Sequence, residues 1–201
     1  MDPIRSESYP LHRREVVKLI LDRRGAMLVV AGLGAPAWDV TAAGDGPLNF
    51  PLWGAMGGAV PLGLGLALAQ PARRVLVITG DGEMLMGLGS LATVAVQSPP
   101  NLAIVVLDNE RYGETGMQPT HTAGEVDLAA IAAAAGFPLT RTISDLAALE
   151  GALPHIYDAP GPLFFTIKVR AETLPLVLPP KDGAYLKDRF RLALLGPEAV
   201  G

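Results

Sequence analysis

Two short polar motifs stand at the ends of two apolar runs in this sequence. A Gly-Asp-Gly at residues 80–82 follows the run at 75–79, and an Asp-Asn pair at 108–109 follows the run at 102–107. Both runs are rich in β-branched residues and nearly uninterrupted, which is typical of strands buried on both faces of a parallel sheet. Parallel strands bring their carboxyl ends to one edge, where open α/β sheets bind ligands. We therefore expect the two motifs to lie side by side.

The residue types at that edge predict a divalent metal and a diphosphate. Asp81 offers a carboxylate and Asn109 an amide oxygen, ligands that suit Mg²⁺ or Ca²⁺ but leave most of the coordination to phosphate oxygens, a backbone carbonyl and water. Gly80 allows the backbone to approach closely. The first backbone amides of the following helix point toward an anion, with the helix dipole behind them. These amides belong to Gly82, Glu83 and Met84.

Each motif alone is a common turn, but their combination is specific. Gly-Asp-Gly followed by Asp108-Asn109 resembles the signature of thiamine diphosphate enzymes, in which the second motif is Asn-Asn. The similarity covers most of the chain. It is closest to the sulfopyruvate and phosphonopyruvate decarboxylase branch, through Gly-Leu-Gly-Ser-Leu-Ala-Thr at 87–93, Tyr-Gly at 112–113 and Gln-Pro-Thr at 118–120.

The resemblance implies a role for each matching residue. Asp81 and Asn109 match the side-chain ligands of Mg²⁺, and Arg111 matches the residue that gives its backbone carbonyl. The matching diphosphate contacts are Gly82, Glu83, Tyr112 and Gly113. Gly34 belongs to the first loop at this edge and is expected near the diphosphate.

A second segment, Leu-Trp-Gly-Ala-Met-Gly at residues 52–57, resembles the part of these enzymes that shapes the cofactor. Met56 matches the bulky residue between the two cofactor rings, and the carbonyl of Gly54 matches the acceptor for the 4′-amino group. Ala55 lies between them. We expect all three to contact thiamine diphosphate.

Four residues depart from the pattern of the family, and we expect them to face the substrate. They are Glu110, Arg111, Glu114 and Met117. His121 is a further candidate, either contacting a substrate anion or transferring a proton, although a single histidine in a loop is often merely solvated. Among these, Arg111 and His121 are the cationic groups expected near an anionic substrate.

Composition limits the other classes of function. The chain has 201 residues, is 50% hydrophobic and contains 23 Gly and 18 Pro, which fits one α/β domain over residues 1–201. A net charge of −4 with dispersed basic residues gives no face for nucleic acid, and the lack of Cys excludes disulfides and thiolate metal sites. The amino terminus lacks the apolar core of a signal peptide, so we expect a cytoplasmic protein.

One uncharged segment, residues 46–72, is long enough to span a membrane. It contains Pro47, Pro51 and Pro61 and lacks the dense Leu, Ile and Val of a spanning helix. We instead expect a buried helix at about 58–69 that helps to bind the cofactor.

The hydrophobic pattern predicts a doubly wound, mainly parallel sheet with helices on both faces. The predicted strands are 27–31, 75–79, 102–107, 139–143 and 164–169. The predicted helices are 12–22, 58–69, 83–97, 127–135, 144–153 and 185–195. The last helix lies in a carboxyl-terminal tail from about 175 to 201, which is expected either to dock as in the family or to remain loosely attached.

A different class of function has its own motif. Residues 32–37 fit Gly-x-Gly-x-x-Ala, the dinucleotide fingerprint. We disfavour it for two reasons: Pro36 is expected to disturb the start of the helix that receives the pyrophosphate, and no strand ending in an acidic residue follows.

The resemblance implies decarboxylation of a 2-oxoacid, with release of CO₂ and an aldehyde. In the family, a Glu of a separate pyrimidine-binding domain activates the cofactor, and this chain has no match to that domain. We therefore expect one subunit of a two-subunit, thiamine diphosphate- and Mg²⁺-dependent enzyme, acting with a pyrimidine-domain partner or self-associating. Two alternatives remain: a subunit of an acetolactate-synthase-like carboligase, and a noncatalytic cofactor-binding module.

Overall fold

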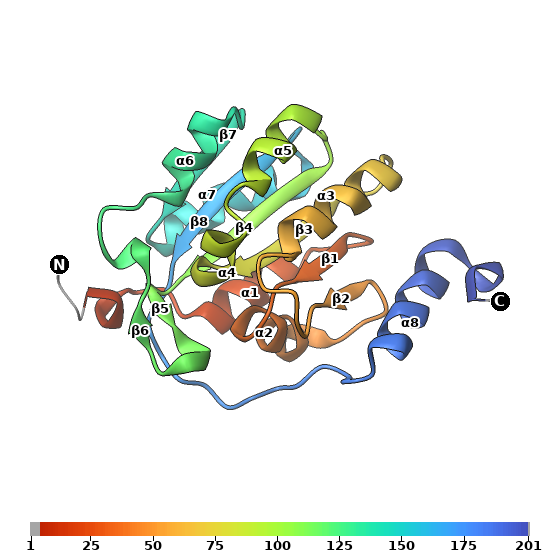
Figure 1. Ribbon diagram of the computed structural model, residues 1–201, viewed down its shortest axis with the longest axis horizontal. Helices are drawn as coiled ribbons and strands as arrows, with labels where there is room; N and C mark the ends of the chain where they lie inside the picture. The colour runs from red at the N-terminus through yellow and green to blue at the C-terminus, as the bar shows by residue number, and fades with distance from the viewer. Residues whose placement is uncertain (1–4, 201) are drawn as a thin grey trace.

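The computed structural model describes residues 5–200 and contains a six-stranded parallel sheet. The strand order is β2-β1-β3-β4-β8-β7 (Figure 1). The bounds are β1 Leu28–Ala31, β2 Asn49–Pro51, β3 Val75–Gly80, β4 Leu102–Asp108, β7 Leu139–Ile143 and β8 Leu163–Lys168. A small antiparallel ribbon, β5 Arg111–Tyr112 with β6 Gln118–Pro119, follows β4. The predicted α/β class is confirmed.

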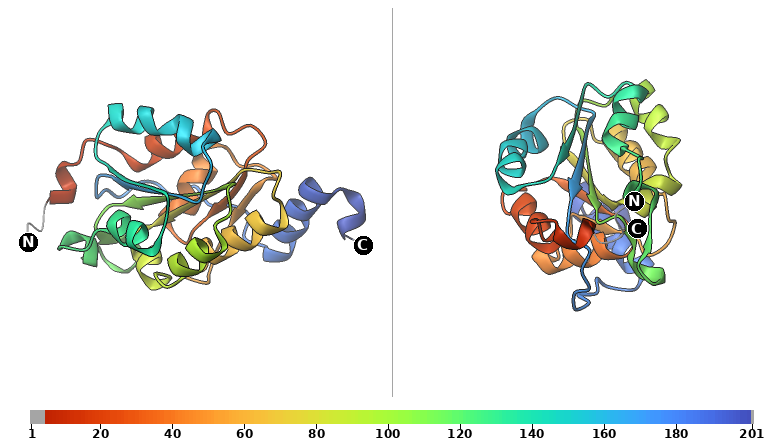
Figure 2. Two further views of the ribbon diagram at one scale, coloured as in Figure 1. Left: turned by 90° about the horizontal axis from the view of Figure 1, so that it is seen from above. Right: turned by 90° about the vertical axis from the view of Figure 1, so that its left-hand side faces the viewer.

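Helices cover both faces of the sheet (Figure 2). Their bounds are α1 Arg13–Leu21, α2 Ala35–Gly44, α3 Ala59–Ala69, α4 Asp81–Met86, α5 Ser90–Gln97, α6 Leu128–Ala135, α7 Leu146–Asp158 and α8 Gly183–Leu195. Alternation along β1 sends Val29 to a core shared with α1, α2 and α7, and Val30 to a core shared with α3, α5 and α6. Burial on both faces explains why the strands are continuous apolar runs.

The register of the central strands sets the functional edge. Gly80 at the end of β3 is paired with Leu107 of β4, so the next residues, Asp81 and Asp108, lie at the same level of the carboxyl edge. On the other side of β4, Asp108 is paired with Lys168 of β8. The sheet thus places two carboxylates and one ammonium group in a row at its carboxyl edge.

The predicted helix at 83–97 is wrong in one respect, because the structure divides it into α4 and α5 at residues 87–89. The reason is a close approach of two backbones. A Cβ at Gly87 would lie 2.5 Å from the carbonyl oxygen of Gly57, in the loop that precedes α3. Helix α7 also continues past the predicted end at 153, to Asp158. The other predicted helices and strands are present with ends within two residues of those expected.

Helix α2 and strand β2 were not predicted. Helix α2 begins directly after Gly34 and accepts Pro36 in its first turn, where the missing amide hydrogen of proline costs no helical hydrogen bond. Pro36 therefore does not disturb the start of this helix, contrary to our expectation. The other objection to dinucleotide binding stands, since β2 consists of Asn49, Phe50 and Pro51 and carries no acidic residue.

The carboxyl-terminal tail docks at the edge of the sheet formed by β2. After β8 the chain runs without regular structure along one side of the molecule and ends in α8, beside β2 (Figure 1). The rings of Phe190 and Phe50 meet edge to face with centroids 5.3 Å apart. Arg189 binds both carboxylate oxygens of Asp45. Of the two expectations for this tail, the docked helix is the one observed.

The uncharged segment at 46–72 contains a strand, a loop and α3, a helix of 11 residues. Within the described residues 5–200, the structure has no helix with the length and apolarity that a membrane crossing requires.

Candidate functional site

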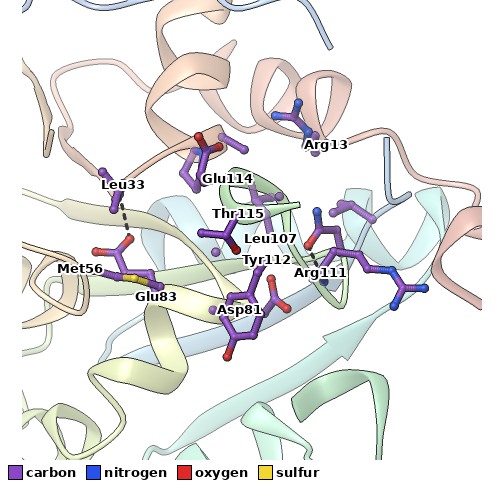
Figure 3. A pocket seen from close by; sticks show the side chains of 17 residues that line it. Arg13, Leu33, Met56, Asp81, Glu83, Leu107, Arg111, Tyr112, Glu114 and Thr115 are labelled. Carbon is purple, nitrogen blue, oxygen red and sulfur yellow. Dashed lines mark hydrogen bonds between the residues drawn. The ribbon is translucent and has the colours of Figure 1, made fainter. Parts of the chain in front are cut away.

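A cavity of about 190 Å³ opens at the carboxyl edge of the sheet, between the loops that follow β1, β3 and β4 (Figure 3). Most of the predicted cofactor and metal residues line it: Met56, Gly80, Asp81, Gly82, Glu83, Asn109, Arg111, Tyr112 and Gly113. The two predicted motifs therefore meet at one cavity, as their spacing indicated.

Asp81 is the most informative side chain of this cavity. It begins α4, is 2% exposed, and receives side-chain hydrogen bonds from hydroxyl groups rather than from a cation. Burial, together with the charge of nearby Asp108, raises its pKa from 3.8 to about 7. A buried carboxylate without a cation is costly, and a bound cation would remove that cost.

Two threonines from the segment after the ribbon surround this carboxylate. The hydroxyl of Thr120 lies 2.5 Å from Oδ2 of Asp81, and that of Thr122 lies 3.3 Å from the same oxygen. Thr122 also donates to Oδ1 of Asp108 at 2.7 Å. Neither threonine was among the predicted site residues.

Asn109 and Arg111 form the turn that begins the ribbon. The amide hydrogen of Arg111 is donated to Oδ1 of Asn109 over 3.0 Å. An amide oxygen has two lone pairs, so this bond leaves one for a metal ion. The turn also fixes the backbone of Arg111, whose carbonyl was the third predicted ligand.

Tyr112 covers the start of α4. A Cβ at Gly82 would lie 2.7 Å from its ring, so the Gly-Asp-Gly motif requires glycine at its third position in this structure. Tyr112 and Gly113 both line the cavity beside Asp81.

The carboxylate of Glu83 is occupied by hydrogen bonds within the protein. Its Oε2 accepts hydrogen bonds from the amide of Leu33 at 3.0 Å and from the hydroxyl of Thr79 at 2.7 Å, and its Oε1 accepts one from the amide of Ala59. Burial raises its pKa despite these bonds. The side chain thus joins the loop after β1 to the start of α3, and its backbone amide is what remains for a diphosphate.

Glu110 does not face the substrate side, so that expectation is wrong. Its side chain is 1% exposed and binds Arg5, Tyr9 and Lys168, behind the cavity. Burial opposes ionisation, but these three partners outweigh it and lower the pKa of Glu110. The residue has a φ of 60°, a left-handed conformation that L residues rarely adopt. Its ion pairs hold that turn in place.

Lys168 compensates the charges of two carboxylates behind the cavity, those of Asp108 and Glu110. Its Nζ lies 2.8 Å from Asp108 and 2.9 Å from Glu110. Burial lowers the pKa of Lys168, but the two carboxylates outweigh this and raise it overall. Asp108, which stands where the family signature has Asn, is therefore neutralised from the neighbouring strand.

Other predicted residues lie near the cavity or away from it. Met56 lines it and is 37% exposed. Ala55, with a φ of 57°, and Gly54 belong to the same loop but do not line the cavity. The side chain of Met84 is buried in the core, which leaves its amide. Gly34 is the residue before α2.

Among the remaining substrate-side candidates, Glu114 lines the cavity and packs against Gly34. Met117 has a φ of 62° and does not line the cavity. His121 is exposed, also outside the lining, with Nδ1 at 3.5 Å from the hydroxyl of Tyr112. Instead, Arg13 of α1 joins the lining, held by a 2.5 Å ion pair with Asp39.

Comparison with known proteins agrees with this geometry. The family model described as "Thiamine pyrophosphate enzyme, C-terminal TPP binding domain" matches residues 36–167. The chain belongs to this family. The match includes both motifs of the cavity, the segment at 52–57 and the five strands from β2 to β8 that belong to the main sheet.

Two relatives are similar over most of this chain. The sulfopyruvate decarboxylase subunit beta of Methanothermobacter thermautotrophicus is 40% identical over 180 residues, covering 90% of this chain and 94% of that protein. The phosphonopyruvate decarboxylase of Streptomyces viridochromogenes is 36% identical over 198 residues, covering 98% of this chain but 49% of that protein. This chain thus has the extent of a subunit in the first case and of about half a protein in the second.

A solved structure supports the fold alone. The benzoylformate decarboxylase of Polynucleobacter necessarius superposes with a TM-score of 0.68 at 20% identity, over 83% of this chain and 34% of that chain. The two chains therefore share a fold at low sequence identity.

The residues present fit the family's metal and cofactor. Within residues 5–200 there is no cluster of three or more His, Cys, Asp or Glu that could hold a metal alone. The donor set of one carboxylate, one amide oxygen and one backbone carbonyl instead suits a cation that keeps phosphate and water ligands. Asp81 is buried and has no cationic partner in the part of the chain that the structure describes, and this observation favours such an ion.

Proposed function

We propose that this chain is the diphosphate-binding subunit of a two-subunit, thiamine diphosphate-dependent 2-oxoacid decarboxylase of the sulfopyruvate or phosphonopyruvate type. The observation that carries the proposal is the cavity with Asp81 and Asn109 at the edge shared by β3 and β4. A relative supports the proposal: the beta subunit of a sulfopyruvate decarboxylase, 94% of whose length this chain covers.

The predicted cofactor and metal residues of the cavity each have a task in this proposal. Thiamine diphosphate, when bound, supplies the electron sink for loss of CO₂. Asp81 and Asn109, with the carbonyl of Arg111, would hold Mg²⁺. The amides at the start of α4 would hold the diphosphate, since they carry the positive end of the helix dipole.

Met56 and Gly54 would set the shape of the cofactor on the opposite side of the cavity. Met56 is fixed in a loop whose neighbour, Gly57, packs against the backbone of Gly87. That contact ties the loop to the α4–α5 junction, so the methionine is presented from a rigid base. A rigid base favours the orientation of the reacting groups.

Activation of the cofactor requires a carboxylate, and no Glu among residues 5–200 matches the activating Glu of the family. Glu83 is engaged by backbone amides and Thr79, and Glu110 lies behind the cavity in ion pairs. We infer that a pyrimidine-domain subunit supplies the acid and closes the cavity. The partly exposed Trp53 and Met56, at the rim, are the apolar residues placed to meet it.

The test is a CO₂-release assay on the purified chain, alone and with a co-expressed pyrimidine-domain subunit. We expect no turnover of sulfopyruvate, phosphonopyruvate or pyruvate by the chain alone, even with saturating thiamine diphosphate and Mg²⁺. The pair should release CO₂ and an aldehyde. Turnover by the chain after rigorous removal of any partner would contradict the two-subunit arrangement.

Product analysis of the same reactions separates the alternatives. An acyloin in place of an aldehyde would identify a carboligase. Binding of thiamine diphosphate without turnover in any pairing would identify a noncatalytic module.

A further inference from the structure

We propose that Thr120 and Thr122 are positioning residues that aim the Asp81 carboxylate at the metal. The proposal rests on the proposed function, because it assigns these residues a role toward the ion that Asp81 would bind. It is carried by the hydrogen-bond network behind the cavity, in which two buried hydroxyls join the carboxylate at the start of α4 to the one at the end of β4.

The network acts on one oxygen of Asp81. Among the described residues, the side-chain hydrogen bonds to this carboxylate end on Oδ2, from Thr120 at 2.5 Å and Thr122 at 3.3 Å. Asp81 itself lines the cavity. Holding Oδ2 on the protein side leaves Oδ1 as the oxygen available to an ion.

The two hydroxyls are built into the protein rather than exposed to water. Thr120 is 3% exposed and Thr122 is 1% exposed. A buried hydroxyl is costly unless it has a partner, and the branched side chain of threonine restricts rotation about χ1. Their direction is therefore fixed by the backbone that carries them.

That backbone belongs to the loop with the other metal ligands. The amide of Thr120 donates to the carbonyl of Glu110 at 3.0 Å and closes the base of the β5–β6 ribbon. Asn109 and Arg111 flank Glu110 at the same base. The threonines thus set the distance between the carboxylate of α4 and the ligands that follow β4.

Thr122 connects this arrangement to a rigid anchor. Its hydroxyl donates to Asp108 at 2.7 Å, and Asp108 is held by Lys168 at 2.8 Å and by the amide of Glu110 at 3.1 Å. Since Thr122 has one hydroxyl hydrogen and the Asp108 contact is the shorter, Thr120 is the main donor to Asp81. We expect the larger effect from Thr120.

The experiment measures Mn²⁺ binding, by electron paramagnetic resonance with saturating thiamine diphosphate, to the full chain co-purified with its pyrimidine-domain subunit. Thr120→Val should weaken Mn²⁺ binding about 10- to 100-fold, as is usual for groups that orient a metal ligand. Thr122→Val should weaken it roughly 3- to 10-fold, the equivalent of one hydrogen bond. Thr120→Ser restores the hydroxyl and should bind within about threefold of the unchanged protein.

Thr166→Val is the matched control. Thr166 is 2% exposed on β8, and its hydroxyl has no hydrogen-bond partner among the described residues. The same substitution there should leave Mn²⁺ affinity unchanged. Unfolding temperatures of the metal-free variants distinguish a positioning role from a structural one, because only positioning predicts loss of affinity that exceeds loss of stability and is rescued by serine.

Two results would overturn the proposal: unchanged Mn²⁺ affinity in Thr120→Val, or equal losses in Thr120→Val and Thr166→Val. If Thr120→Val does not fold, unchanged affinity in Thr122→Val overturns it instead. Failure of the unchanged protein to bind Mn²⁺ with thiamine diphosphate would contradict the proposed function itself, so the two failures are distinct.

Discussion

The carboxyl edge of the sheet contains acids in two different settings. Asp81 lies at the cavity with hydroxyl partners and a pKa raised to about 7 by burial and by Asp108. Behind it, Asp108 and Glu110 share Lys168, and Glu110 also binds Arg5. Asp108 and Glu110, the rear acids, are thus paired with cations, whereas Asp81, the front acid, has no cationic partner among the described residues.

The difference shows how position rather than residue type separates a binding acid from a structural one. An acid already paired with a buried cation has little to gain from a metal ion, and its loss leaves the cation uncompensated. An unpaired buried acid lowers the stability of the folded protein, and binding of a cation restores that stability. Substitutions in the two regions should therefore affect different properties.

The largest effect is expected at the front acid. Asp81→Ala removes the predicted carboxylate ligand and should abolish Mg²⁺-dependent thiamine diphosphate binding, while the metal-free fold is retained. Isothermal titration calorimetry measures the first property and circular dichroism the second. Cofactor binding with unchanged affinity would show that Asp81 does not hold the metal.

At the rear, Lys168→Met should cost about 3 kcal/mol of folding free energy, because it leaves buried Asp108 without its cation and Glu110 with Arg5 alone. Urea denaturation of the metal-free chain measures it. Adding Asp108→Asn should restore part of the loss, since the amide needs no counterion. Lys187→Met, at a lysine on α8 whose side chain is 60% exposed, is the control and should have almost no effect. A loss in Lys187→Met equal to that in Lys168→Met would contradict the pairing.

Met56 tests the front region without changing a charge. Met56→Ala should slow turnover by the two-subunit enzyme about tenfold or more, because misoriented reacting groups are costly, yet leave thiamine diphosphate affinity nearly intact. Steady-state kinetics and a binding titration on the same sample separate the two effects. Unchanged turnover would mean that Met56 is only a packing residue.

The raised pKa of Asp81 should also make the stability of the metal-free protein depend on pH. The pKa of Asp81 rises on folding from 3.8 to about 7, so the metal-free native state retains a proton that the unfolded state releases. Stability from this group is therefore lost as the pH rises from about 4 to about 7. Asp81→Asn should remove that loss, so its stability relative to the unchanged protein should increase with pH. A constant difference across this range would refute the raised pKa.

The smallest effect is expected for Arg5. Its side chain is 42% exposed, and Glu110 keeps Tyr9 and Lys168 when it is removed. Arg5→Met should cost about 1 kcal/mol or less in urea denaturation, in line with exposed ion pairs. A cost equal to that of Lys168→Met would show that the rear cluster depends on all of its cations equally.

Much of the fold was predictable because the strands are buried on both faces. Such burial requires long apolar runs, and the runs at 75–79 and 102–107 appear almost unchanged as β3 and β4. Strand β2 escaped prediction because three residues with a proline carry no periodic signal. The break between α4 and α5 depends on a contact with Gly57, distant in sequence, which no local pattern contains.

The positions of Asp81 and Asn109 were likewise fixed by the sequence, since each follows a strand and neighbouring parallel strands end together. The sequence did not determine what each neighbouring acid does. Glu110, Lys168 and Arg5 are far apart in the sequence and meet only because β4 and β8 are adjacent and the amino-terminal segment folds back across them. Charge compensation depends on distance in space. Only the tertiary structure could therefore distinguish Asp81, whose described partners are hydroxyl groups, from Asp108 and Glu110, which are paired with cations.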